Sequence, residues 1–165
     1  MKHSRRILLC ITLFLGTITY VNAQALRGDE AAINHQLDEL HRLASEANYE
    51  QYFALYHDDA VFLGTDATER WPIAEFRQYT KSRFDTGRGW TYHMTSRNIY
   101  VSESGTTAWF DELLDNENLG VTRGTGVLVK ENGEWAISQY NLTIPVPNQL
   151  AREFVARIRE LENGG

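Results

Sequence analysis

The chain has 165 residues, of which 42% are hydrophobic and 12% aromatic, and its 16 basic and 22 acidic residues give a formal charge of −6. This length and apolar content fit one globular domain with a substantial core, and they exclude a disordered or multidomain chain. The acidic balance argues against nucleic acid and anionic membranes as partners.

The first 23 residues have the features of a signal peptide. Basic residues at positions 2, 5 and 6 precede an apolar run over positions 7–18, and Val21-Asn-Ala23 is typical of a cleavage site. A membrane anchor is the alternative, but the run is shorter than the ~20 residues that a spanning helix needs. We therefore expect export to the periplasm or secretion, with residues 24–165 as a single mature domain that has no membrane attachment.

The mature chain would contain no cysteine, because Cys10 lies in the expected signal peptide. That excludes disulfides, a thiolate nucleophile and sulfur-ligated metals. Cleavage also removes three basic residues, which leaves 13 basic against 22 acidic residues and a charge of −9. No cofactor is expected, and there is no phosphate-binding glycine loop. No Gly-x-Ser-x-Gly motif occurs either, which leaves hydrolysis through an activated serine without support. No metal is expected either, because the histidines at positions 35, 41, 57 and 93 lack metal-ligand spacing.

The first half of the mature chain is predicted to be mainly helical. Asp29 is placed to cap a helix whose apolar stripe, Ile33 to Ala44, would cover a sheet. A shorter helix over residues 49–56 is followed by a strand over residues 60–63, with Asp58-Asp59 as the turn between them. Pro72 is expected to begin a further helix over residues 73–84.

Residues 90–145 are predicted to form four successive strands that contain two hairpins. In the first hairpin, a Ser104-Gly105 turn pairs Val101 with Ala108, Ile99 with Phe110 and Arg97 with Glu112 on one face. The opposite face pairs Tyr100 with Trp109 and Asn98 with Asp111. A slip of one residue would exchange Glu112 for Asp111 as the inward carboxylate, and the apolar neighbours favour Glu112.

The second hairpin turns at Asn132-Gly133, a strong signal for a two-residue loop. Pairing Glu131 with Glu134 would place Arg123, Thr125, Val127 and Val129 on one face with Ala136, Ser138, Tyr140 and Leu142. The apolar content favours this face as the interior, although Leu128, Trp135 and Ile137 lie on the other. Arg123 and Tyr140 would then point inward.

Charged residues on the core face of a sheet are costly unless they are paired or open to a water-filled cavity. Two interpretations stay open: a structural Arg97–Glu112–Arg123 cluster, or a pocket. For a pocket, the candidate catalytic residues are Glu112, Asp111 and Tyr140. The candidate ligand-binding residues are Arg123, Arg97, Trp71, Asp66, Tyr92, His93, Trp109 and Asn141.

Several of these candidates also have a purely structural interpretation. Asp66 would stabilise a turn, Trp71 would be buried in the core, and His93 would lie at the rim of the pocket. Trp109 would sit on the outer sheet face, where exposed aromatics mark a dimer interface. Beyond the sheet, Pro145 and Pro147 end the last strand, and an apolar stripe from Leu150 to Leu161 predicts a helix that packs on the domain or on a partner subunit.

The order of elements predicts an α+β fold with a curved antiparallel sheet wrapped around N-terminal helices into a cone with an internal pocket. At residues 30–160 the chain resembles the SnoaL-like branch of the nuclear transport factor 2-like superfamily, also called the ketosteroid isomerase-like fold. The resemblance rests on Phe62-Leu-Gly-Thr-Asp66 with Glu69 and Trp71, Ala108-Trp-Phe-Asp-Glu112, Arg123-Gly-Thr-Gly-Val127, and Gln139-Tyr-Asn-Leu142 before Pro145-Val-Pro-Asn148.

The resemblance implies a small-molecule pocket and, in many relatives, a homodimer formed through the outer sheet face. Similar folds serve isomerases, cyclases, dehydratases, hydrolases and binding modules. One hypothesis is an exported protein that binds a small polar or carboxylate-bearing ligand through Arg123, Arg97 and Tyr140. The other is a cofactor-independent isomerase, cyclase or dehydratase in which Glu112 or Asp111 moves a proton and Tyr140 or Arg123 stabilises the oxyanion.

Overall fold

The computed structural model describes residues 26–164, so the expected signal peptide lies outside the described residues. A long N-terminal helix covers residues 26–45. The later elements are α2 (Tyr49–Ala54), β1 (Tyr56–Leu63), β2 (Arg70–Pro72), α3 (Ile73–Phe84), β3 (His93–Val101), β4 (Thr107–Asn116), β5 (Gly120–Glu131), β6 (Glu134–Thr143) and α4 (Ala151–Asn163). Within residues 26–164, no helix is both long enough and apolar enough to cross a membrane.

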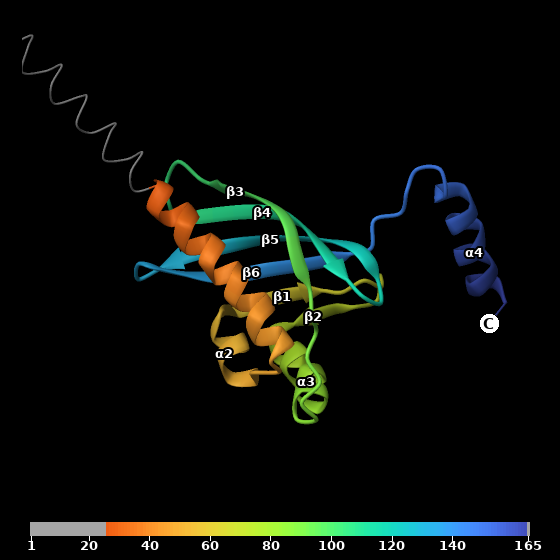
Figure 1. Ribbon diagram of the computed structural model, residues 1–165, viewed down its shortest axis with the longest axis horizontal. Coiled ribbons are helices and arrows are strands. Elements are labelled where there is room, and N and C mark those ends of the chain that lie inside the picture. Colours follow the sequence, from red (N-terminus) through yellow and green to blue (C-terminus); the bar gives the residue numbers. More distant parts are fainter. Residues whose placement is uncertain (1–25, 165) are drawn as a thin grey trace, which may run out of the picture.

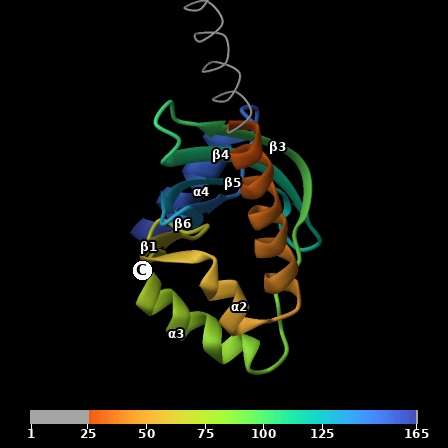
Figure 2. The ribbon, with the colours of Figure 1, turned by 90° about the vertical axis from the view of Figure 1, so that its left-hand side faces the viewer.

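The strands form one six-stranded sheet in the order β2-β1-β6-β5-β4-β3. All neighbours are antiparallel except β1 and β6, which run parallel. Figures 1 and 2 show the sheet curving around the N-terminal helix, with α2 and α3 as a second helical layer beside β1 and β2. The predicted α+β fold with a curved sheet wrapped on helices is confirmed.

The core lies between the N-terminal helix and the inner sheet face. Ile33, Leu37 and Leu40 are at most 2% exposed, and they recur at the spacing that places side chains on one helix face. The helix begins before Asp29, so the prediction that this residue caps it is wrong. The Asp29 carboxylate instead accepts hydrogen bonds from Lys130 Nζ and Trp135 Nε1, and so ties the helix to the last hairpin.

The hairpin of β3 and β4 has the predicted register, with Arg97 opposite Glu112 and Ile99 opposite Phe110. Glu112 is 1% exposed and therefore lies on the inner face, as predicted. Tyr100 and Trp109 stack on the outer face with ring centroids 5.8 Å apart. The register holds because no bulge interrupts the pairs between the turn and Arg97.

The last hairpin is confirmed from its turn as far as the Leu128–Ile137 pair, but not beyond. A bulge at Ser138 moves the pairing by one residue, so that Tyr140 faces Gly126 and Thr143 faces Arg123. The inner face of β5 therefore consists of Thr122, Gly124, Gly126 and Leu128. The prediction that the opposite face of β5, which carries Arg123, lies in the interior is wrong. Tyr140 and Leu142 point inward as predicted, whereas Arg123 is exposed on the outer face.

The predicted turn at Asp58-Asp59 is also wrong. α2 ends at Ala54, and both aspartates lie within β1, which already pairs with β6 at Tyr56. The strand is irregular between Tyr56 and Val61. Both aspartate side chains are exposed to solvent, so a strand can accommodate them. The pairing of β1 in the sheet overrides their preference for turns.

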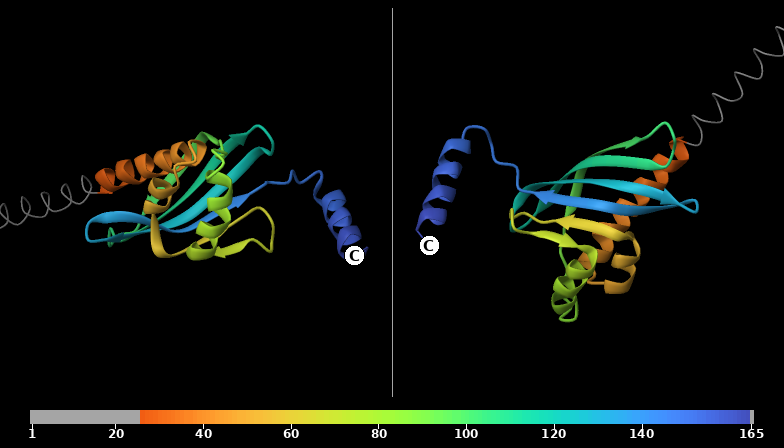
Figure 3. Two further views of the ribbon diagram at one scale, coloured as in Figure 1. Left: turned by 90° about the horizontal axis from the view of Figure 1, so that it is seen from below. Right: turned by 180° about the vertical axis from the view of Figure 1, so that it is seen from behind.

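The last strand ends at Thr143, before Pro145 and Pro147, as predicted. α4 follows after a short linker, and none of its residues is buried. Figures 1 and 3 show α4 standing apart from the sheet at the far end of this linker.

Candidate functional site

The Glu112 carboxylate is the centre of a buried polar network. Its Oε1 accepts hydrogen bonds from the Tyr140 hydroxyl and from His41 Nε2, each at 2.9 Å. Its Oε2 accepts from Arg97 Nε at 2.8 Å. The three donors come from β6, the N-terminal helix and β3, so the network joins both layers of the fold.

The glycine at position 124 makes room for this network. Gly124 lies directly opposite Glu112 on β5. A Cβ atom there would overlap the Tyr140 hydroxyl oxygen and approach Glu112 Oε1 to 2.8 Å. The absence of a side chain on β5 therefore lets Glu112 and Tyr140 meet across the strand between them.

Arg97 lies behind Glu112 and is held on its other side. Its side chain is 2% exposed. Nη1 donates to Asp38 Oδ1 at 2.8 Å and to the side-chain oxygen of Asn34 at 2.8 Å. Two carboxylates, of Glu112 and Asp38, therefore compensate the charge of the guanidinium, while its buried Nη2 has no hydrogen-bond partner among residues 26–164.

The network sets the charge states of its members. Burial raises the pKa of Glu112, but hydrogen bonds and charge from His41 and Arg97 together outweigh burial and hold the pKa below its ordinary value. Burial, reinforced by the neighbouring Glu112 carboxylate, raises the pKa of Tyr140 well above its ordinary value. Glu112 is therefore ionised and Tyr140 protonated at neutral pH.

The ionised carboxylate also fixes the histidine. A carboxylate can only accept hydrogen bonds, so His41 Nε2 carries a proton. In the neutral ring this leaves Nδ1 with a lone pair, and Nδ1 has no hydrogen-bond partner among the described residues. The His41 side chain is 11% exposed and lines the cavity described next.

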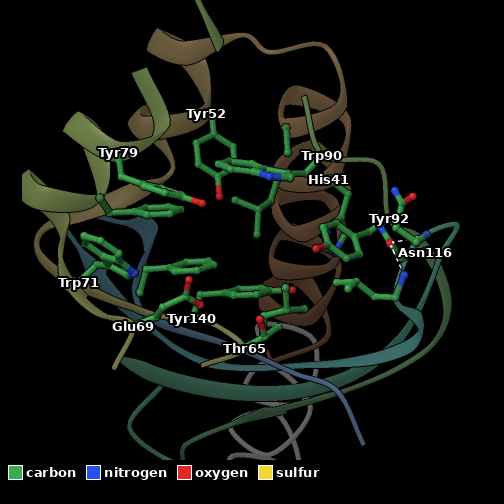
Figure 4. A pocket seen from close by; sticks show the side chains of 18 residues that line it. His41, Tyr52, Thr65, Glu69, Trp71, Tyr79, Trp90, Tyr92, Asn116 and Tyr140 are labelled. Carbon is green, nitrogen blue, oxygen red and sulfur yellow. Dashed lines mark hydrogen bonds between the residues drawn. The ribbon is translucent and has the colours of Figure 1, made fainter. Parts of the chain in front are cut away.

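A cavity of about 270 Å³ opens beside His41 between the helical layer and the inner sheet face. Figure 4 shows Tyr140, Trp71, Tyr79, Trp90 and His41 around it. The remaining wall is mainly apolar, and the polar groups come from Thr65, Glu69, Tyr92, Asn116 and Asn118. A concave, largely apolar site with a few polar groups is typical of small-molecule binding.

Six aromatic rings of this region share nearly one orientation. The rings of Phe62 and Phe76 lie 4.0 Å apart at 5°, and Phe62 is also at 5° to Tyr140. Trp90 lies at 10° to Phe76 and at 11° to Tyr79, which in turn stacks on Trp71 at 24°. These parallel faces offer a flat ligand several surfaces on which to stack.

The structure brings only some of the predicted site residues together. Tyr140, Trp71 and Tyr92 line the cavity, while Glu112 and Arg97 lie behind its wall. The outer sheet face carries four residues that cannot reach the cavity, contrary to the prediction: Arg123, Asp111, Trp109 and Asn141.

Asp66 and His93 are both exposed and do not line the cavity described above. Asp66 Oδ1 accepts from the backbone N–H of Thr68 at 2.8 Å, which is the turn-stabilising role considered from the sequence. His93 is the first residue of β3 and borders a second depression, which is also lined by Asp38, Met94 and His41.

Four residues that line the cavity were not among the predicted site residues: His41, Tyr52, Phe62 and Trp90. His41 had a readable signal, because it lies four residues after Leu37 and three before Ala44 and so belongs to the buried helix stripe. Among residues 26–164, no cluster of three or more metal-ligating side chains is found.

A family model described as SnoaL-like domain matches residues 33–147, so the chain belongs to the SnoaL-like domain family. Its fold is that of the nuclear transport factor 2-like superfamily, which the sequence had indicated. No curated protein matches the chain.

Solved structures of low sequence identity share the fold. A nuclear transport factor 2-like protein of unknown function from Pseudomonas putida is 11% identical, with a TM-score of 0.64 over 74% of this chain and 91% of its own. A protein from Novosphingobium aromaticivorans, provisionally named scytalone dehydratase, is 16% identical, with a TM-score of 0.62 over 75% of this chain and 89% of its own. A second protein from that organism, with a cystatin-like fold, is 15% identical, with a TM-score of 0.60 over 81% and 93%.

Proposed function

We propose that this chain is a cofactor-independent enzyme of the isomerase or dehydratase type, which moves a proton on a small, flat molecule held in the cavity. The observation that carries this proposal is the His41–Glu112 pair. A fully buried, ionised carboxylate orients an imidazole at the cavity wall, as a general base requires.

His41 would act through Nδ1, which takes a proton from a carbon beside a carbonyl or hydroxyl-bearing group of the substrate. The imidazolium that forms is stabilised by Glu112, which already accepts the Nε2 proton. The same imidazolium then returns the proton, either to another carbon of the substrate, as in isomerisation, or to a leaving hydroxyl that departs as water. Atoms and charge balance in both cases without a cofactor.

Tyr140 has a different role from the oxyanion donor expected from the sequence. Its hydroxyl proton is directed at Glu112 Oε1, so it positions the carboxylate. Glu112 is likewise a positioning residue, because His41 and Tyr140 lie between it and the cavity. The substrate-facing base is therefore His41.

The alternative of binding a carboxylate-bearing ligand through arginine loses its support. Arg123 lies on the outer sheet face, and Arg97 is engaged by Glu112, Asp38 and Asn34. The provisional name of the Novosphingobium aromaticivorans protein supports dehydratase chemistry at the level of a shared fold. Export and homodimer formation are further parts of the proposal, and the N-terminal sequence of the protein from the periplasm or medium would test the first.

Proton exchange tests the chemistry before the natural substrate is known. Small bicyclic ketones such as 2-tetralone would be incubated with the protein in deuterium oxide, and loss of the α-proton signal would be followed by nuclear magnetic resonance. We expect the wild type to accelerate exchange, and His41→Asn to reduce the acceleration by about 10²–10⁴-fold, the usual contribution of a general base. Glu112→Gln should reduce it less, since the imidazole stays in place.

Arg123→Ala is the matched control, because Arg123 is exposed on the opposite sheet face and should leave exchange unchanged. Binding of the ketones without any exchange would instead support a non-catalytic binding protein. Equal exchange by wild type and His41→Asn would refute the assignment of the base.

A further inference from the structure

Glu69 carries the only formal charge at pH 7 among the residues from 26 to 164 that line the cavity. It is half-buried and lies in the loop between β1 and β2, and no lysine or arginine of the described chain lines the cavity with it. Behind His41, the carboxylates of Glu112 and Asp38 outnumber the guanidinium of Arg97. The wall of the cavity is therefore negative where it is charged, which disfavours anionic ligands.

The loop holds the Glu69 carboxylate in one position. The backbone N–H of Gly64 donates to the Glu69 carbonyl oxygen at 2.9 Å, and the backbone N–H of Glu69 donates to the Asp66 carbonyl oxygen at 3.0 Å. Glu69 Oε2 accepts a hydrogen bond from the backbone N–H of Asp66 at 3.2 Å. A Cβ atom at Gly64 would overlap the same oxygen, so the carboxylate lies directly over this glycine. The carboxylate is therefore positioned before any ligand binds, which favours affinity.

The second oxygen of this carboxylate has no partner. The loop is already closed by its backbone hydrogen bonds and by the bond from the Thr68 N–H to Asp66 Oδ1. Within residues 26–164, Glu69 forms no ion pair and its Oε1 accepts no hydrogen bond. A carboxylate can only accept hydrogen bonds, and an unpaired polar atom in a mainly apolar wall is unfavourable. Oε1 is therefore available to a hydrogen-bond donor of the ligand.

Glu69 and His41 contact different parts of the cavity. Figure 4 shows Glu69 apart from His41, on the side of the cavity where Trp71 lies. The Trp71 ring stacks on Tyr79 with centroids 5.2 Å apart. A flat molecule that lies along these rings would meet His41 at one position and Glu69 at another. The two residues therefore define two separate contact points on one ligand.

We propose that Glu69 determines the specificity of the cavity by selecting a flat, uncharged ligand whose hydroxyl group donates to Glu69 Oε1. A hydroxyl donor forms a short, strong hydrogen bond with a carboxylate. An ammonium group would also donate, but its transfer from water into a mainly apolar cavity is much less favourable. A carboxylate-bearing ligand would bring like charges together, so the cavity should reject it. This inference rests on the cavity as the binding site of the proposed function, but not on catalysis by His41.

Isothermal titration calorimetry at pH 7 tests this proposal with substituted 2-tetralones: the 5-, 6-, 7- and 8-hydroxy isomers, their methyl ethers and the corresponding carboxylic acids. We expect the wild type to bind at least one hydroxy isomer roughly ten- to a hundredfold more tightly than its methyl ether, the range for a hydrogen bond to a charged group. The carboxylic acids should bind more weakly than either.

Glu69→Gln removes the charge and keeps the shape of the side chain, so it should reduce the hydroxyl preference by roughly tenfold and weaken the rejection of the carboxylic acids. Glu75→Gln is the matched control, because Glu75 is exposed on α3 and does not line the cavity. It makes the same change in net charge and should keep the wild-type preference. Unchanged thermal midpoints would show that both variants are folded.

Three results would overturn the proposal: no hydroxyl preference in the wild type, tighter binding of a carboxylic acid, or a Glu69→Gln variant that keeps the full preference. The outcome is separable from that of the exchange experiment on His41. A hydroxyl preference without proton exchange would support the role of Glu69 and refute catalysis. Exchange without a hydroxyl preference would do the reverse, and no binding of any tetralone would refute both proposals.

Discussion

Replacing Arg97 by methionine should expose how strongly the buried network depends on its cation. Met has a similar length, but it leaves the Glu112 carboxylate, whose side chain is fully buried, without its guanidinium partner. Removing one member of a buried ion pair typically costs about 3–5 kcal/mol, because the remaining charge is uncompensated. We expect Arg97→Met to lower the free energy of unfolding by this amount at pH 7.

The cost should depend on pH in a direction that the pKa shifts fix. In the wild type, the pKa of Glu112 lies below its unfolded value of about 4.3, so its contribution to stability is present above that pH and is lost as the pH falls through the folded pKa. Arg97 is one of the groups that lower this pKa, so its removal should raise the pKa of Glu112. The free-energy difference from wild type should therefore be smaller at pH 5 than at pH 7.

Urea denaturation at both pH values, followed by far-ultraviolet circular dichroism, measures these free energies. Glu112→Gln and the double variant complete a mutant cycle, and the double variant should be less destabilised than the sum of the single variants. Additive free energies, or a cost at pH 7 below about 1 kcal/mol, would refute the view that Arg97 compensates a buried charge.

Two further substitutions test the packing around the site. Gly124→Ala should destabilise the protein by about 1–3 kcal/mol in thermal melts, because its methyl group overlaps the Tyr140 hydroxyl. Gly28→Ala is the control, since a Cβ there meets nothing within 4 Å. Equal melting temperatures of the two variants would contradict the close approach of Tyr140 to Gly124. Phe76→Ala should cost about 3–5 kcal/mol in urea denaturation, since this 2% exposed ring stacks on Phe62 and Trp90; a cost below about 1 kcal/mol would mean that the aromatic layer is loosely packed.

The fold and half of the network could be read from the sequence, because their signals are local. The Ser104-Gly105 turn and eight alternating residues placed Arg97 opposite Glu112 on the inner face, and no bulge disturbed that count. The Asn132-Gly133 turn was as clear, but the bulge at Ser138 reversed the inner and outer residues of β5 relative to β6. A bulge has no strong local signature, so Arg123 was placed in a pocket that it cannot reach.

His41 could not be joined to Glu112 by any local rule. The two residues are 71 positions apart, and their hydrogen bond depends on how the helix rotates and slides on the sheet. Asp29 shows the same limit, since its partners Lys130 and Trp135 lie more than 100 residues away. Sequence patterns indicate which side of a helix or strand a residue lies on. The angle at which the N-terminal helix packs on the sheet decides which residues of the two elements meet.

These long sequence separations bear on how the protein acquires its structure. The N-terminal helix is synthesised first, yet its apolar face has no sheet to cover until the last hairpin, which ends at Thr143, has formed. Folds dominated by such distant contacts close large loops and fold in milliseconds to seconds rather than microseconds. Until then the stripe from Ile33 to Ala44 has no sheet to cover it and is open to chaperones and to aggregation, and the His41–Glu112 contact can form only once the helix and β4 are both present.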